Sequence, residues 1–154
     1  MKVSVLMSVY KNENPEWFRD AVKSVAEQTV KPDEILIVQD GMLSDELYSM
    51  CDKLKDCYSV IRYLKLDKNY GLGMALHYGV KACKNELIAR MDTDDIAVEN
   101  RFELLISSIY LSVFVPGHCP QPHNINSSLM YGPVLPIFFT LTNNLLFDDR
   151  VISL

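Results

Sequence analysis

The chain has 154 residues, 49% of them hydrophobic, a length that suits one domain with a substantial core. Its formal net charge is −5 and it contains no basic run, which argues against nucleic acid as a partner. The four cysteines form no Cys-x-x-Cys pair, so they are interpreted as buried thiols in a reducing compartment, not as zinc ligands or a disulfide framework.

Strands and helices are predicted to alternate along the first two-thirds of the chain. The predicted strands are nearly continuous apolar runs, which is typical of strands buried on both faces of a sheet. The predicted helices carry apolar residues at helical spacing, and Asn14 and Ser44 are suitable N-caps for the first two. In chain order, the elements are a strand at Val3–Tyr10, a helix from Pro15 to about Gln28, a strand at Glu34–Gln39, a helix after Ser44, a strand at Val60–Leu64, a helix from Gly71 to Lys84 and a strand from Leu87.

This alternation predicts an α/β fold with a doubly wound, mostly parallel sheet. Ligands of such sheets bind outside the carboxyl ends of the strands. Ser8, Tyr10, Asp40 and the acidic segment Asp92–Asp95 all stand at predicted strand ends. The topology therefore predicts that these residues, far apart in sequence, converge on one crevice.

The acidic segment places three carboxylates, those of Asp92, Asp94 and Asp95, within four residues. Carboxylates this close repel one another unless a cation lies among them, which favours a divalent metal that holds a phosphorylated ligand. The alternative is that Asp94 and Asp95 form the N-terminus of the next helix, where negative charge is also favourable. The segment alone leaves both interpretations open.

The composition changes near residue 105. Beyond it, Asp148, Asp149 and Arg150 are the only charged residues, and five of the seven prolines lie there. We therefore expect a domain over residues 1–105 and an atypical, proline-rich tail over residues 106–154, such as a truncated gene or an altered reading frame would produce. No stretch provides the ~18 clean apolar residues of a membrane helix.

Several segments taken together resemble family 2 glycosyltransferases of the GT-A fold, over residues 1 to about 105. The segments are Val3–Glu13, Glu27–Thr29, Glu34–Gly41 with Ser44 and Asp45, Asn69–Gly73 with Ala75 and Leu76, and Arg90–Asp95, which includes an Asp-x-Asp motif. The resemblance implies a nucleotide-diphosphate sugar donor, Mn²⁺ or Mg²⁺ as cofactor, and inverting transfer to a saccharide or lipid-linked acceptor in cell-surface polysaccharide biosynthesis. A cytoplasmic location is expected, with peripheral association at the inner face of the membrane left open.

The resemblance also implies roles for individual residues. Ser8, Tyr10 and Glu13 would line the nucleotide pocket, and Asp40 would accept a hydrogen bond from the base. Arg90 would lie beside the phosphates or brace the acidic loop, and Asp92 would touch the ribose or the sugar. Asp94 would ligate the metal, with Asp95 sharing or taking over that role. The family's downstream catalytic base has no recognisable counterpart, so the catalytic residue is left unassigned. The alternative function is an inactive nucleotide-sugar-binding remnant or interaction fragment.

Overall fold

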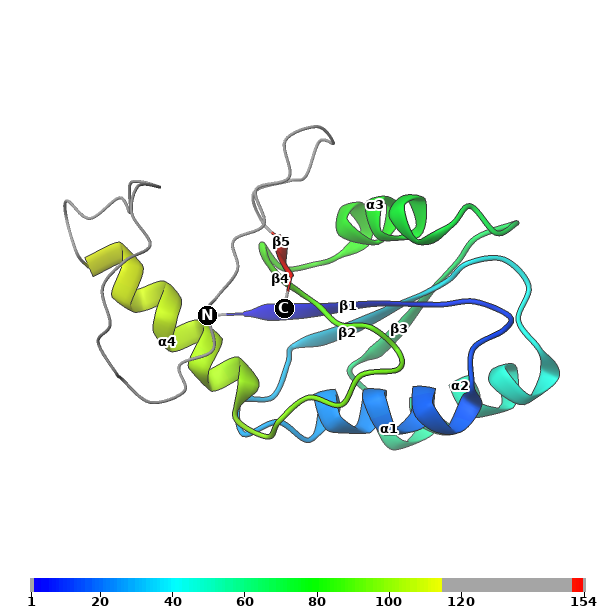
Figure 1. The fold of residues 1–154 in the computed structure, drawn as a ribbon, viewed down its shortest axis with the longest axis horizontal. Coiled ribbons are helices and arrows are strands. Elements are labelled where there is room, and N and C mark those ends of the chain that lie inside the picture. The colour runs from blue at the N-terminus through cyan, green and yellow to red at the C-terminus, as the bar shows by residue number, and fades with distance from the viewer. Residues whose placement is uncertain (1, 115–150, 154) are drawn as a thin grey trace, which may run out of the picture.

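The computed structural model of the chain describes residues 2–114 and 151–153, in which helices and strands alternate (Figure 1). The elements are β1 (Val3–Val9), α1 (Pro15–Ala26), β2 (Glu34–Gln39), α2 (Asp45–Cys57), β3 (Ile61–Lys65), α3 (Leu72–Ala82), β4 (Leu87–Arg90), α4 (Arg101–Phe114) and β5 (Val151–Ser153). The predicted elements through β4 are confirmed, with ends that shift by one or two residues. Both predicted caps are present, since the side chains of Asn14 and Ser44 accept hydrogen bonds from the first turns of α1 and α2.

The sheet has the strand order β3-β2-β1-β4-β5, and every pair of neighbouring strands is parallel. Helices α1 and α2 cover one face and α3 covers the other, which confirms the predicted doubly wound α/β fold (Figure 1). Because all strands run the same way, their carboxyl ends share one edge of the sheet. The loops that carry the predicted site residues start from that edge.

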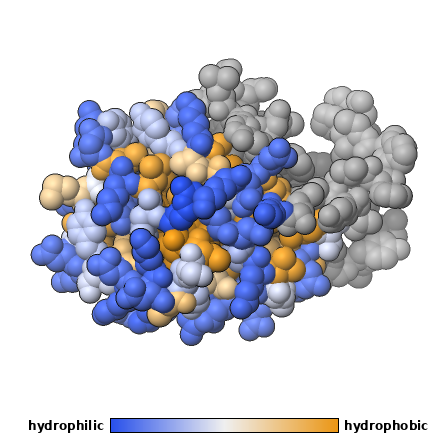
Figure 2. All heavy atoms as spheres, turned by 180° about the vertical axis from the view of Figure 1, so that it is seen from behind, coloured by the Kyte–Doolittle hydropathy of each residue, from blue (hydrophilic) through white to orange (hydrophobic). Residues whose placement is uncertain are grey.

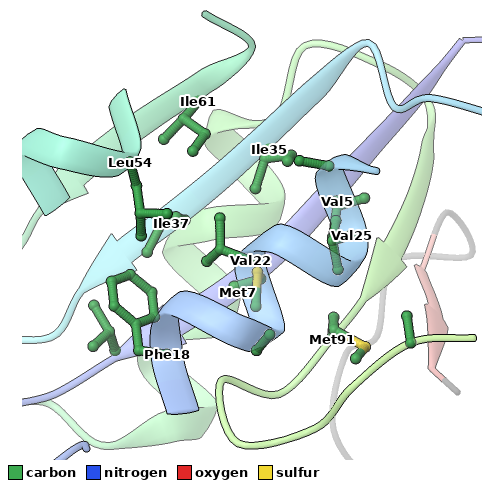
Figure 3. Packing of buried hydrophobic residues seen from close by; sticks show 14 of the residues in the cluster. Val5, Met7, Phe18, Val22, Val25, Ile35, Ile37, Leu54, Ile61 and Met91 are labelled. Atoms are coloured by element: carbon green, nitrogen blue, oxygen red, sulfur yellow. The ribbon is translucent and has the colours of Figure 1, made fainter. Parts of the chain in front are cut away.

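Two apolar clusters fill the space on either side of the sheet. Alternate residues of β1 divide between them. Val5 and Met7 face α1 and α2 (Figure 3), whereas Leu6 packs against α3. Phe18, fully buried on α1, is among the largest side chains of the first cluster. This division explains why the strands are continuous apolar runs: each has a packed layer on both faces.

Helix α3 lies close to the sheet through small residues. Ala75 and Gly79 are its buried positions, and a Cβ at Gly79 would lie 2.4 Å from Leu6 Cδ1. Apolar side chains also reach the surface, where Figure 2 shows them as separate areas among hydrophilic ones. Of the helices that the structure describes, none has the length and apolar character needed to cross a membrane.

A buried carboxylate lies at the opposite, amino-terminal edge of the sheet. Glu34 is only 2% exposed, pairs with Arg62, and accepts hydrogen bonds from Ser4 Oγ at 2.6 Å and from the Lys84 backbone N–H at 2.8 Å. Burial alone would raise the pKa of Glu34, but the hydrogen bonds from Lys84, Ser4 and Arg62 outweigh it and hold the pKa below its ordinary value. The apolar pattern of β2 gave no indication of this network.

Three cysteines belong to the described residues, and all three are free thiols. Cys51 is buried and Cys83 is half-buried, whereas Cys57 is exposed at the end of α2. The prediction of buried thiols is therefore correct for Cys51 and wrong for Cys57, which lies on the solvent side of its helix. Cys119 lies outside the described residues.

The expected change of unit at residue 105 falls inside α4, which continues to Phe114. At the other end of the chain, β5 pairs with β4 as the fifth strand of the sheet. The division into residues 1–105 and 106–154 stays a prediction, since most of the second range lies outside the described residues.

Candidate active site

The acidic segment follows β4 and runs beside the end of β1. The register pairs Arg90, the last residue of β4, with Leu6 of β1, and the Met91 N–H donates to the Leu6 carbonyl at 3.0 Å. The chain therefore leaves β4 three residues before β1 ends, and residues 92–95 pass beside Ser8 and the loop that follows β1. Helix α4 does not begin until Arg101, so the alternative that Asp94 and Asp95 form a helix N-terminus is wrong.

Thr93 anchors the acidic segment to the first loop. Its side chain is buried, and Thr93 Oγ1 lies 3.0 Å from Glu13 Oε2 and 3.4 Å from the Ser8 carbonyl oxygen. The Thr93 hydroxyl has one proton to donate, and it donates it to the Glu13 carboxylate because that contact is the shorter one. Thr93 was not predicted as a site residue, because its position between two aspartates is the only signal that the sequence provides.

Arg90 and Asp92 form an ion pair. Arg90 Nη2 lies 2.7 Å and 3.0 Å from the two carboxylate oxygens of Asp92. Both roles expected for Arg90, beside the phosphates or bracing the acidic loop, stay predictions. Asp94 and Asp95, in contrast, are exposed. Within residues 2–114 and 151–153, no group of three His, Cys, Asp or Glu side chains gathers as a metal site by itself.

A second cation, which sequence analysis also missed, faces the acidic segment from the start of α4. Arg101 Nη1 lies 3.3 Å from Met91 Sδ, and the side chain is half-buried. Burial lowers the pKa of Arg101, while the negative charges of Asp95 and Asp92 act in the opposite direction. Arg90 and Arg101 therefore offset part of the negative charge of Asp92 and Asp95.

Asp40 lies at the end of β2 and is 3% exposed. Its Oδ1 accepts a hydrogen bond from the Tyr70 N–H at 2.7 Å, and its Oδ2 accepts one from the Gly71 N–H at 2.9 Å. Gly41 has φ +84°, and a Cβ there would lie 2.6 Å from the Asn69 nitrogen. The end of β2 is thus packed closely against the loop that leads into α3, and Asp40 fixes that loop.

The space at the N-terminus of α3 is open. Gly71 precedes the helix with φ +84° and provides no side-chain cap, and a Cβ at Gly71 or Gly73 would have no neighbour within 4 Å. Free backbone N–H groups at a helix N-terminus attract anions. Tyr10, which follows β1, is 43% exposed at the same edge of the sheet.

The exposed carboxylates fit a divalent cation that is shared with a diphosphate. Mg²⁺ in nucleotide sites is usually held by one or two carboxylates together with substrate phosphate oxygens and water, and Mn²⁺ accepts the same oxygen ligands. Asp94 and Asp95 offer that donor set, whereas Asp92 is occupied by Arg90.

The solved structures similar to this chain have the GT-A glycosyltransferase fold, in agreement with its parallel sheet and alternating helices. A crystal structure of S. aureus TarS matches with a TM-score of 0.61 and 21% identity, over 72% of this chain and 20% of that one. A mannosyltransferase, PcManGT from Pyrobaculum calidifontis in complex with GDP-Man and Mn²⁺, matches with a TM-score of 0.60 and 18% identity, over 72% of this chain and 32% of that one.

The family model described as "Glycosyl transferase family 2" matches residues 4–116, and the chain belongs to this family. It is 41% identical over 105 residues to the Escherichia coli UDP-Gal:alpha-D-GlcNAc-diphosphoundecaprenol beta-1,3-galactosyltransferase. It is 40% identical over 104 residues to the amylovoran biosynthesis glycosyltransferase AmsE of Erwinia amylovora. These matches cover 68% of this chain but only 38% and 39% of the two relatives.

Proposed function

We propose that the chain is the donor-binding part of a glycosyltransferase that moves a sugar from a nucleotide-diphosphate sugar to a saccharide or lipid-linked acceptor. The observation that carries the proposal is the acidic segment, held beside the end of β1 by Thr93 and Glu13 with two carboxylates exposed. The E. coli relative uses a UDP-sugar and a diphosphoundecaprenol acceptor, and the E. amylovora relative acts in amylovoran biosynthesis, which supports a role in cell-surface polysaccharide assembly.

In this proposal each strand end contributes one part of the donor site. Ser8, Tyr10 and Glu13 line the nucleotide pocket, with the exposed ring of Tyr10 available for stacking on the base. Asp40 accepts a hydrogen bond from the base through oxygen lone pairs that its two backbone contacts leave unused. Asp92, oriented by Arg90, contacts the ribose or the sugar.

Asp94 and Asp95 would hold a divalent cation, Mn²⁺ or Mg²⁺, against the diphosphate. When bound, the cation would neutralise the charge that develops on the leaving diphosphate. The mannosyltransferase of the same fold holds GDP-Man and Mn²⁺ together, so the fold accommodates both ligands. The carboxylates of Asp94 and Asp95 are the ligands in this proposal because Asp92 is paired with Arg90.

The acceptor side of the reaction has no assigned residue. By family resemblance the transfer is inverting, which requires a base within hydrogen-bond reach of the acceptor hydroxyl. Glu103, on α4, is held by Thr29 Oγ1 at 3.2 Å and is not proposed for this role. A lipid-linked acceptor would place the reaction in the cytoplasm at the inner face of the membrane, with peripheral association.

A transfer assay separates this function from nucleotide-sugar binding without transfer. The purified chain is incubated with labelled UDP-, GDP- and dTDP-sugars, Mn²⁺ and cell-envelope acceptors. Because no described residue is assigned as the base, we expect donor binding with at most slow donor hydrolysis. Metal-dependent transfer to an acceptor would show that the chain carries its own acceptor site and base. If the chain bound none of the donors, the proposed function would be contradicted.

A further inference from the structure

The segment that follows the acidic residues is tied to the C-terminal end of α1. Gln28, just beyond that helix, is 2% exposed. Its Nε2 donates to the Val98 carbonyl at 2.6 Å and to the Ser24 carbonyl at 3.0 Å, and its Oε1 accepts from the Phe102 N–H at 3.2 Å. One buried amide therefore uses both of its N–H groups and its oxygen to join α1, the loop and α4.

The neighbours of Gln28 strengthen the same connection. Ser24 Oγ accepts a hydrogen bond from the Ala97 N–H at 3.0 Å. The Thr29 N–H donates to the Glu99 carbonyl at 2.8 Å. Residues 97–99 are thus each bonded to the end of α1, although they are separated from it by about 70 positions in sequence.

The acidic segment is consequently held on both sides. On its N-terminal side, Thr93 is bonded to Glu13. On its C-terminal side, Ala97 is buried and bonded to Ser24. Between these two anchors lie Asp94, Asp95 and Ile96, all exposed. These two anchors therefore fix both ends of the short segment that carries the two exposed carboxylates.

We propose that Gln28 is a positioning residue for the metal-binding carboxylates, an inference that rests on the proposed function. It contacts neither metal nor donor, and acts by holding Val98 and Phe102 so that Asp94 and Asp95 are presented toward the diphosphate. N–H groups in the first turn of a helix have no partner within that helix, and the Phe102 N–H belongs to the first turn of α4. The side-chain oxygen of Gln28 therefore caps this N–H group. Without the Gln28 side chain, Val98 in the loop and Phe102 at the start of α4 would lose these hydrogen bonds.

The test variant is Gln28→Met, which keeps the length of the side chain but removes all three hydrogen bonds. The matched control is Glu34→Gln, a change at an equally buried side chain at the other edge of the sheet. Amide hydrogen exchange reports on the segment directly. We expect exchange over residues 96–103 to rise at least about tenfold in Gln28→Met, because one lost hydrogen bond corresponds to about that factor and the variant removes three. In the control, exchange over these residues should stay unchanged.

The second readout is the affinity for UDP and for GDP, each with and without Mn²⁺, and the variants are compared with the nucleotide that the unaltered chain binds. We expect Gln28→Met to reduce the gain in affinity that Mn²⁺ provides by about 10- to 100-fold, the range seen when groups that orient metal ligands are removed. The affinity for the nucleotide without metal should stay the same, because the contacts proposed for the base come from the ends of β1 and β2 and the Arg90–Asp92 pair does not involve Gln28. The control should keep both affinities.

The outcomes distinguish this inference from the proposed function. Unchanged exchange over residues 96–103 in Gln28→Met overturns the inference, and so does increased exchange with an intact Mn²⁺-dependent gain. If the unaltered chain gains no affinity from Mn²⁺ for either UDP or GDP, the proposed metal site fails and the positioning role fails with it. A loss confined to Gln28→Met, seen in both readouts, supports the inference.

Discussion

Replacement of Asp40 tests how the end of β2 fixes the loop before α3. Its two carboxylate oxygens accept from the backbone N–H groups of Tyr70 and Gly71, and Asp40 itself is buried. A hydrogen bond to a charged group contributes about 1.5–3 kcal/mol. Asp40→Ala removes both acceptors and should lower the free energy of unfolding by about 3–6 kcal/mol, a large part of the ~5–15 kcal/mol of a typical domain. Asp40→Asn keeps one acceptor oxygen and should lose about half as much.

Urea unfolding at equilibrium measures these differences, because the midpoint shifts while the slope stays constant if only the native state is affected. Asp52→Asn is the control, since Asp52 is an exposed carboxylate in the middle of α2. Its free energy of unfolding should stay within about 0.5 kcal/mol of the original. If Asp40→Ala matched this control, the two hydrogen bonds would contribute nothing and Asp40 would not fix the loop.

Three further changes test the site and the sheet. Asp94→Asn should abolish Mn²⁺-dependent nucleotide binding and leave thermal unfolding unchanged, whereas full retention would move the metal elsewhere or remove it. Thr93→Val should lower the free energy of unfolding by about 1 kcal/mol and weaken Mn²⁺-dependent binding, because Glu13 loses its donor; equal behaviour to the unaltered chain would contradict the anchor. The pKa of Glu34 lies below its ordinary value of 4.5, so its contribution to the free energy of unfolding is present above pH 4.5 and is lost as the pH falls further. Glu34→Gln should therefore make the free energy of unfolding less dependent on pH in the acid range. The same pH dependence in Glu34→Gln and the unaltered chain would contradict this role of Glu34.

The order of the elements could be predicted from the sequence because buried parallel strands and capped helices have strong local patterns. Asn14 and Ser44 satisfy the first N–H groups of their helices wherever the helices pack, so the caps could be predicted without knowledge of the fold. The edge on which Ser8 and Asp40 lie followed from the parallel topology.

The contacts between loops could not be predicted in the same way. Thr93 and Gln28 act through partners about 70 to 80 positions away, and a polar side chain carries no local signal for such a partner. Arg101 was missed for the same reason, since only the fold brings the start of α4 beside the acidic segment. The exposure of Cys57 was misjudged because an apolar neighbourhood in sequence does not specify which side of a helix faces the core.

Calorimetric titration of the chain with UDP and GDP, each in the presence and absence of Mn²⁺, tests the central claim most directly. The account predicts that at least one of the two nucleotides binds, that Mn²⁺ tightens its binding, and that the gain disappears in Asp94→Asn. A ligand present at about 100 times its dissociation constant should also stabilise the fold by about 2.7 kcal/mol. Absence of binding by both nucleotides with Mn²⁺, in a chain that unfolds cooperatively, would contradict the account.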